Sequence, residues 1–120
     1  MGKILVVDDD ANICRLVKDF FEDLKGHTVY MATNSEDALA TVHEHEPEVA
    51  LLDIMMPNVH GVEVLRQIKQ VKPEIKAIMI TAVDDKDIAR EAMSEGAVDY
   101  VTKPLDLNYL DAVVTFQLME

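Results

Sequence analysis

The stretch Ile4-Leu5-Val6-Val7-Asp8-Asp9-Asp10 places three consecutive carboxylates directly after an apolar run. A continuous apolar run of this length is typical of a strand that is covered on both faces of a parallel sheet. Carboxylates at the edge of a core repel one another, so the arrangement calls for a cation, a shared proton or a nearby lysine. The run alone leaves another interpretation open, a solvated acidic turn that caps the next helix.

Four more short apolar runs follow, and they alternate with segments of helical spacing. The runs lie at residues 28–32, 49–52, 77–80 and 100–101, and the helical segments at about 13–24, 34–46, 61–71, 85–95 and 107–119. Repetition of this βα unit predicts a doubly wound parallel sheet with helices on both faces, an α/β three-layer sandwich. The last run is shorter and more polar, so we expect it at a sheet edge.

The first helical segment has the clearest amphipathic pattern in the chain. Its apolar stripe predicts six inward-facing side chains: Ile13, Leu16, Val17, Phe20, Phe21 and Leu24. Gly26 follows the stripe and is expected to end the helix in the left-handed conformation. The second helix is expected to begin at Asn34 or Ser35, with Asp37 placed for a capping interaction.

Composition narrows the function classes. The chain has 120 residues, so one domain over residues 1–120 is expected. It carries 23 acidic and 11 basic side chains, which give a net charge of −12. Such a surface is repelled by nucleic acid and by anionic membrane, which argues against direct binding to either. The chain contains neither a 20-residue apolar stretch nor a signal-peptide pattern. The lone Cys14 is expected to be a reduced packing residue, and the sequence predicts a soluble cytoplasmic domain.

Polar residues follow the other predicted core strands. Asp53 follows the third run, Thr81 the fourth, and Lys103 the fifth. Parallel strands bring their carboxyl ends to one edge of a sheet, so these groups and the aspartate run should share a crevice. Carboxylates suit a hard cation such as Mg²⁺, and a metal beside an ammonium and a hydroxyl forms a set that binds phosphoryl oxygens. A carboxylate can itself accept a phosphoryl group.

Four segments of the chain closely resemble a bacterial response regulator receiver domain of two-component systems. They are residues 4–10, 51–57, 80–82 and 100–104, in the family's order. The resemblance covers the whole chain and implies a flavodoxin-like (βα)5 fold with strand order 2-1-3-4-5, the order for which a member of this family is a known example. It implies phosphorelay signalling by a phosphoprotein that catalyses only its own phosphorylation and dephosphorylation and is otherwise no enzyme.

The resemblance also assigns the phosphoacceptor and the metal ligands. Asp53 would carry the aspartyl-phosphate. Asp9 and Asp53 would ligate Mg²⁺ (or Mn²⁺) directly, the backbone carbonyl of Met55 would add a ligand, and Asp8 would act through a coordinated water. Asp10 is expected first as a helix cap and second as a charge near the pocket. Val83 and Met55 flank the phosphoryl group in the family, and their apolar character predicts slow hydrolysis of the phosphate.

The remaining roles concern signalling. Lys103 would pair with the phosphoryl group, next to a Lys103–Pro104 peptide that is commonly cis in the family. Thr81 would move to bond a phosphoryl oxygen, and Tyr100 would be the aromatic switch that follows it. The implied donor is a sensor histidine kinase or a histidine phosphotransfer domain. The fourth helix, fifth strand and fifth helix, residues 86–119, would control an output domain or protein and can dimerise in relatives.

Two alternatives come from other function classes. A phosphatase of the haloacid-dehalogenase type would use Asp8 as nucleophile and Asp10 as general acid. Ala11 and Asn12 replace that family's usual Gly-Thr, the chain lacks a cap domain, and Asp53 would have no role. A pure interaction module would keep the fold without accepting phosphate, which the intact set of Asp53, Thr81 and Lys103 argues against.

Overall fold

The structure, a computed structural model, describes residues 2–56, 59–81 and 86–119. Its centre is a five-stranded parallel sheet in the order β2-β1-β3-β6-β7. The strands are β1 (Lys3–Val7), β2 (Thr28–Ala32), β3 (Val49–Asp53), β6 (Lys76–Thr81) and β7 (Asp99–Thr102). Counted along this sheet alone, the order is 2-1-3-4-5, so the predicted topology is confirmed, and the short polar strand lies at an edge.

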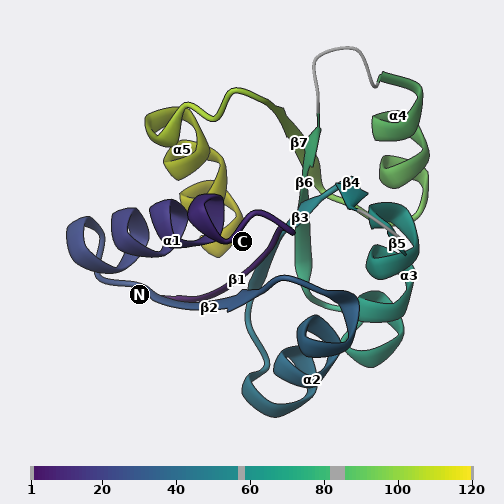
Figure 1. Ribbon diagram of the computed structural model, residues 1–120, viewed down its shortest axis with the longest axis horizontal. Helices are drawn as coiled ribbons and strands as arrows, with labels where there is room; N and C mark the ends of the chain where they lie inside the picture. The colour runs from purple at the N-terminus through teal and green to yellow at the C-terminus, as the bar shows by residue number, and fades with distance from the viewer. Residues whose placement is uncertain (1, 57–58, 82–85, 120) are drawn as a thin grey trace.

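Helices cover both faces of this sheet. They are α1 (Ala11–Asp19) with its π-helical continuation η1 (Phe20–Leu24), α2 (Ser35–His45), α3 (Gly61–Val71), α4 (Lys86–Ser94) and α5 (Leu107–Leu118). Figure 1 shows α1 and α5 on one face and α2, α3 and α4 on the other. Neighbouring strand residues belong to opposite cores: Ile4 and Val6 lie with α1 and α5, whereas Leu5 and Val7 lie with α2 and α3. Burial on both faces explains why the strand is apolar without alternation.

Local signals fix several element ends. Gly26 has a φ of 75° and ends the first helical segment as expected. Asn34 caps α2, since its Oδ1 accepts a hydrogen bond of 2.8 Å from the backbone N–H of Asp37. The structure adds an unpredicted antiparallel hairpin of two short strands, β4 (Met55–Met56) and β5 (Val59–His60). The expected helix start at residue 85 lies outside the described residues.

The prediction for the first helix was wrong at two positions. Leu16 is 52% exposed and Leu24 is 71% exposed. The line that faces the sheet consists instead of Cys14, Val17 and Phe21, all of which are buried. The π-helical turns add a residue per turn and so break the 3.6-residue spacing from which Leu24 was predicted to point inward. Cys14 is a buried free cysteine, so its predicted packing role is confirmed.

The helices within the described ranges are too short or too polar to span a bilayer.

Candidate functional site

The carboxyl ends of the sheet strands bring the predicted polar groups together. Asp8 directly follows β1, Asp53 ends β3, Thr81 ends β6, and Lys103 directly follows β7. Asp8 is fully buried, and Asp53 and Thr81 are only 4% and 2% exposed. Polar side chains are rarely buried to this extent unless they are paired or functional, so this edge of the sheet is the candidate site.

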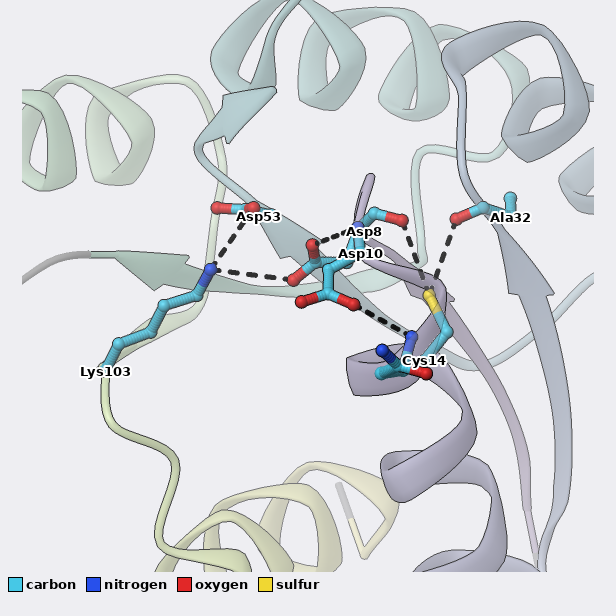
Figure 2. Close-up of polar contacts among 7 residues, drawn as sticks. Asp8, Asp10, Cys14, Ala32, Asp53 and Lys103 are labelled. Carbon is cyan, nitrogen blue, oxygen red and sulfur yellow. Dashed lines mark hydrogen bonds and ion pairs between the residues drawn. The ribbon is translucent and has the colours of Figure 1, made fainter. Parts of the chain in front are cut away.

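Lys103 connects two of the strand ends. Its Nζ lies 3.3 Å from Oδ2 of Asp53 and 3.6 Å from Oδ2 of Asp8 (Figure 2). The backbone N–H of Lys103 donates to the carbonyl of Thr81 at 2.8 Å, which ties the loop to the end of β6. The Lys103–Pro104 peptide is cis, as the resemblance implied. One ammonium therefore serves two buried carboxylates.

Only one of the two carboxylate oxygens of Asp8 accepts a hydrogen bond from the described part of the chain, although Lys103 forms an ion pair with the other at 3.6 Å. The Oδ1 of Asp8 accepts a hydrogen bond of 2.9 Å from the backbone N–H of Asp10, whereas its buried Oδ2 has no hydrogen-bond donor among the described residues. Burial raises the pKa of Asp8 to about 6; the Asp10 N–H opposes this rise, and the charge of Asp53 adds to it. Burial lowers the pKa of Lys103, but the two aspartates outweigh it and the net pKa is raised.

Three carboxylates form a cluster that fits a hard cation. Asp8, Asp9 and Asp53 each offer an oxygen, and these oxygens lie within 4.8 Å of one another. Asp8 and Asp53 are buried, while Asp9 is exposed and leaves the site open to solvent. An oxygen-only donor set that keeps room for water suits Mg²⁺ or Mn²⁺, and a cation would give Oδ2 of Asp8 a close partner in addition to the Lys103 ammonium at 3.6 Å. The backbone of Met55 follows in β4, and the ligand role of its carbonyl stays a prediction.

Asp10 and Cys14, at the start of the first helix, both contact Asp8. Asp10 caps α1, because its Oδ1 accepts a hydrogen bond of 2.9 Å from the backbone N–H of Asn12. The predicted capping role is therefore confirmed. The Sγ of Cys14 lies 3.5 Å from the carbonyl oxygen of Asp8 and 3.8 Å from that of Ala32 (Figure 2). Burial raises the pKa of Cys14 to about 11, so the side chain remains a neutral thiol. No motif in the sequence predicted this contact.

Gly61 supports the backbone beneath Asp53. A side chain at this position would collide with the backbone oxygen of Asp53 and would lie 2.6 Å from Cα of Ile54. The N–H of Gly61 donates to the carbonyl of Ile54 at 2.6 Å. The helix α3 therefore begins in direct contact with the end of β3, and only glycine fits there.

Tyr100 lies on the edge strand β7 and is 40% exposed. Its role as a switch, like that of Thr81, stays a prediction. Val83, which was expected to affect hydrolysis, lies outside the described residues.

Comparisons with known proteins agree with this geometry. The family model for the response regulator receiver domain matches residues 4–115. The chain is 35% identical over 106 residues to the probable C4-dicarboxylate response regulator DctR of Bacillus subtilis, and 38% identical over 112 residues to the transcriptional regulatory protein ZraR of Klebsiella oxytoca. It spans 47% of the length of the first and 25% of the second, with 88% and 93% of this chain aligned.

Solved structures show the same similarity in three dimensions. The BeF3-activated DrrB receiver domain is 37% identical with a TM-score of 0.88, and the match covers 100% of this chain and 99% of that one. The CheY-like receiver domain protein from Methanospirillum hungatei JF-1 is 29% identical with a TM-score of 0.92, covering 98% and 94%. NtrX from Brucella abortus is 32% identical with a TM-score of 0.92, covering 98% of this chain and 27% of that one. The chain belongs to the response regulator receiver domain family, whose members act in phosphorelay signalling.

Proposed function

We propose that this receiver domain accepts a phosphoryl group on Asp53 from a phosphohistidine of a sensor kinase or a histidine phosphotransfer domain. The observation that carries the proposal is the position of Lys103, whose Nζ contacts both Asp53 and Asp8 at the carboxyl edge of the sheet. Asp53 also presents its side chain next to two further carboxylates. An acidic cluster beside an ammonium is a set that can bind a cation and a phosphoryl group together.

The transfer step follows from these groups. A carboxylate oxygen of Asp53 attacks phosphorus, the P–N bond to the donor imidazole breaks, and its electron pair stays on that ring, so an aspartyl-phosphate forms. Asp8, Asp9 and Asp53, with the carbonyl of Met55, would hold Mg²⁺ or Mn²⁺. When bound, the cation neutralises charge on the phosphoryl oxygens. Lys103 would pair with one of these oxygens and give up part of its contact with Asp53.

Phosphorylation of Asp53 would change the surface formed by α4, β7 and α5. The phosphoryl group adds a doubly charged group beside Thr81 and Lys103, and contacts that differ between two arrangements shift the population toward one of them. In the proposal Thr81 bonds a phosphoryl oxygen and Tyr100 changes its rotamer. The surface of α4, β7 and α5 carries exposed Tyr100, Tyr109 and Phe116. This surface would contact an output domain or protein, or a second copy after phosphorylation.

Partners and location belong to the same proposal. The curated relatives are longer than this chain, and their names describe regulators. A receiver that controls an output domain in the cytoplasm, where the lone Cys14 would stay reduced, fits these observations. A receiver family is not in itself a catalytic family, and the domain would catalyse only its own phosphorylation and dephosphorylation.

The alternative functions are less favoured. A phosphatase with Asp8 as nucleophile and Asp10 as acid would need both side chains to face substrate. Asp8 is fully buried, and the carboxylate of Asp10 caps α1. A pure interaction module would have no use for the ammonium that Lys103 places against Asp53.

Phosphoryl uptake tests the proposal. The wild-type protein, incubated with Mg²⁺ and acetyl phosphate, should take up hydroxylamine-labile phosphate, and Asp53→Asn should take up none. Asp23→Asn, which removes an exposed acid in η1, is the matched control and should behave as wild type. Full uptake by Asp53→Asn would contradict the assignment.

A further inference from the structure

The strand β2 is an open edge of the main sheet. It pairs with β1 on one side and is the first strand in the sheet order. Such a strand exposes backbone N–H and C=O groups that can pair with a strand from another molecule. The outward backbone groups of β2 must therefore be covered if the protein is not to associate through this strand.

Two hydrogen bonds show which residues of β2 face outward. The N–H of Thr28 donates to the carbonyl of Gly2, and the carbonyl of Ala32 accepts from the N–H of Asp8. Backbone groups of successive residues in a strand point to opposite sides, so residues 28, 30 and 32 face β1. The backbone groups of Val29 and Met31 face away from the sheet. Met31 is 43% exposed.

Side chains of the first helix cover the outward groups of Val29. The Oε2 of Glu22 accepts a hydrogen bond of 2.8 Å from the N–H of Val29, and Nζ of Lys18 donates to its carbonyl at 3.0 Å. Lys18 and Glu22 also form an ion pair of 3.0 Å with each other. The Val29 N–H, and after it Lys18, lower the pKa of Glu22, so the carboxylate is ionised at neutral pH. We call these two side chains the edge cap.

The end of the helix brings the edge cap to the strand. Lys18 lies in α1 and Glu22 in the π-helical turns of η1. Phe21, which is buried, anchors this segment, and its carbonyl accepts from the N–H of His27 at 3.0 Å. The chain then turns directly into β2. The π-helical segment therefore keeps Phe21 in the core while Glu22 reaches the backbone of the strand.

We propose that the edge cap of Lys18 and Glu22 prevents β2 from pairing with β2 of a second copy of this chain. An antiparallel pair of β2 strands around a two-fold axis would use the same outward groups, those of Val29 and Met31, on both copies. With the cap in place, an incoming strand must displace two charge-assisted hydrogen bonds. The cap acts on a surface remote from the strand ends that hold Asp53, and it does not depend on the proposed phosphoryl transfer.

A pair of double variants tests the proposal. Lys18→Ala/Glu22→Ala removes the edge cap at constant net charge. Arg15→Ala/Asp19→Ala is the matched control, since it removes one base and one acid of α1 at constant net charge and both residues are exposed. Sedimentation over a wide concentration range should show a monomer–dimer equilibrium for the first variant only. Circular dichroism and the exchange rate of the Leu51 amide, in the central strand β3, report whether each variant is folded.

Amide hydrogen exchange provides the second measurement. In Glu22→Ala at low concentration, the Val29 amide should exchange about tenfold faster than in wild type, the factor that corresponds to one hydrogen bond of about 1.4 kcal/mol. In the double variant, the Val29 and Met31 amides should both become more protected from exchange as the protein concentration rises. If the double variant does not fold, the single variant Lys18→Met takes its place. This variant keeps the Glu22 bond to Val29, and it should still form dimers at high concentration, where wild type stays monomeric. A Val29 rate unchanged by Glu22→Ala, or a folded cap variant that stays monomeric, would overturn the proposal.

Discussion

Replacing Asp8 by Asn should stabilise the metal-free protein at neutral pH. The carboxylate of Asp8 is fully buried, and burial is the main cause that raises its pKa from 3.8 to about 6. A rise of this size corresponds to about 3 kcal/mol of unfavourable free energy for the ionised side chain. Asn is neutral and of the same size, and it keeps an oxygen that can accept from the N–H of Asp10. We expect a net gain of about 2 kcal/mol after imperfect hydrogen bonding of the new amide.

The gain should depend on pH in a defined direction. Below about pH 3.8 the carboxyl of Asp8 is protonated in both the folded and the unfolded protein, so it costs nothing. Between 3.8 and about 6 only the unfolded protein releases this proton, and the folded state loses stability as the pH rises. Above about pH 6 the cost is complete. The stability difference between Asp8→Asn and wild type should therefore grow over this interval and then level off.

Urea denaturation in EDTA, at several pH values, measures this difference. Asp9→Asn is the matched control, because it removes an acid of the same cluster that is exposed to solvent and should change stability less. Adding Mg²⁺ should raise the free energy of unfolding of wild type and so reduce the difference in stability between wild type and Asp8→Asn. A metal-free Asp8→Asn variant that is less stable than wild type at neutral pH, or a stability difference that does not vary with pH, would show that burial of the Asp8 carboxylate does not destabilise the fold.

Three further variants test other parts of the structure. Lys103→Met leaves Asp8 and Asp53 without their ammonium, so it should destabilise the metal-free protein by about 1–3 kcal/mol in urea titrations and slow phosphoryl uptake. Gly61→Ala should cost about 2–4 kcal/mol in thermal denaturation, because the new methyl group meets the backbone at the end of β3, and an unchanged melting temperature would contradict this. His27 has a lowered pKa because of burial, so its folded form resists protonation and stability should fall as the pH drops through about 6.5; His27→Gln should remove that part of the pH dependence.

The sequence predicted the sheet because its central strands are buried on both faces. A run such as residues 49–52 has no polar residue to interrupt the pattern, and all of these residues are fully buried. The strand ends extended further than predicted, to Asp53 and Thr81, because backbone pairing continues through polar residues that hydropathy does not mark. The hairpin of β4 and β5 was not predicted, since two-residue strands carry no periodicity.

The candidate site was predictable for a related reason. In a parallel sheet the residue after each strand has a defined place, so the meeting of Asp8, Asp53 and Lys103 followed from topology. Contacts between a side chain and a distant backbone have no such rule. The Glu22 bond to Val29 depends on where a π-helical segment ends, and neither residue belongs to a motif.

The position of the phosphoryl group after labelling decides whether Asp53 is the phosphoacceptor. Peptide mapping by mass spectrometry, after incubation with Mg²⁺ and acetyl phosphate, distinguishes Asp53 on β3 from Asp8 at the end of β1. We expect one phosphoryl group per chain, on Asp53, with Lys103→Met labelled more slowly at the same position. A phosphoryl group on Asp8, or a chain that binds Mg²⁺ and remains unlabelled, would contradict this expectation.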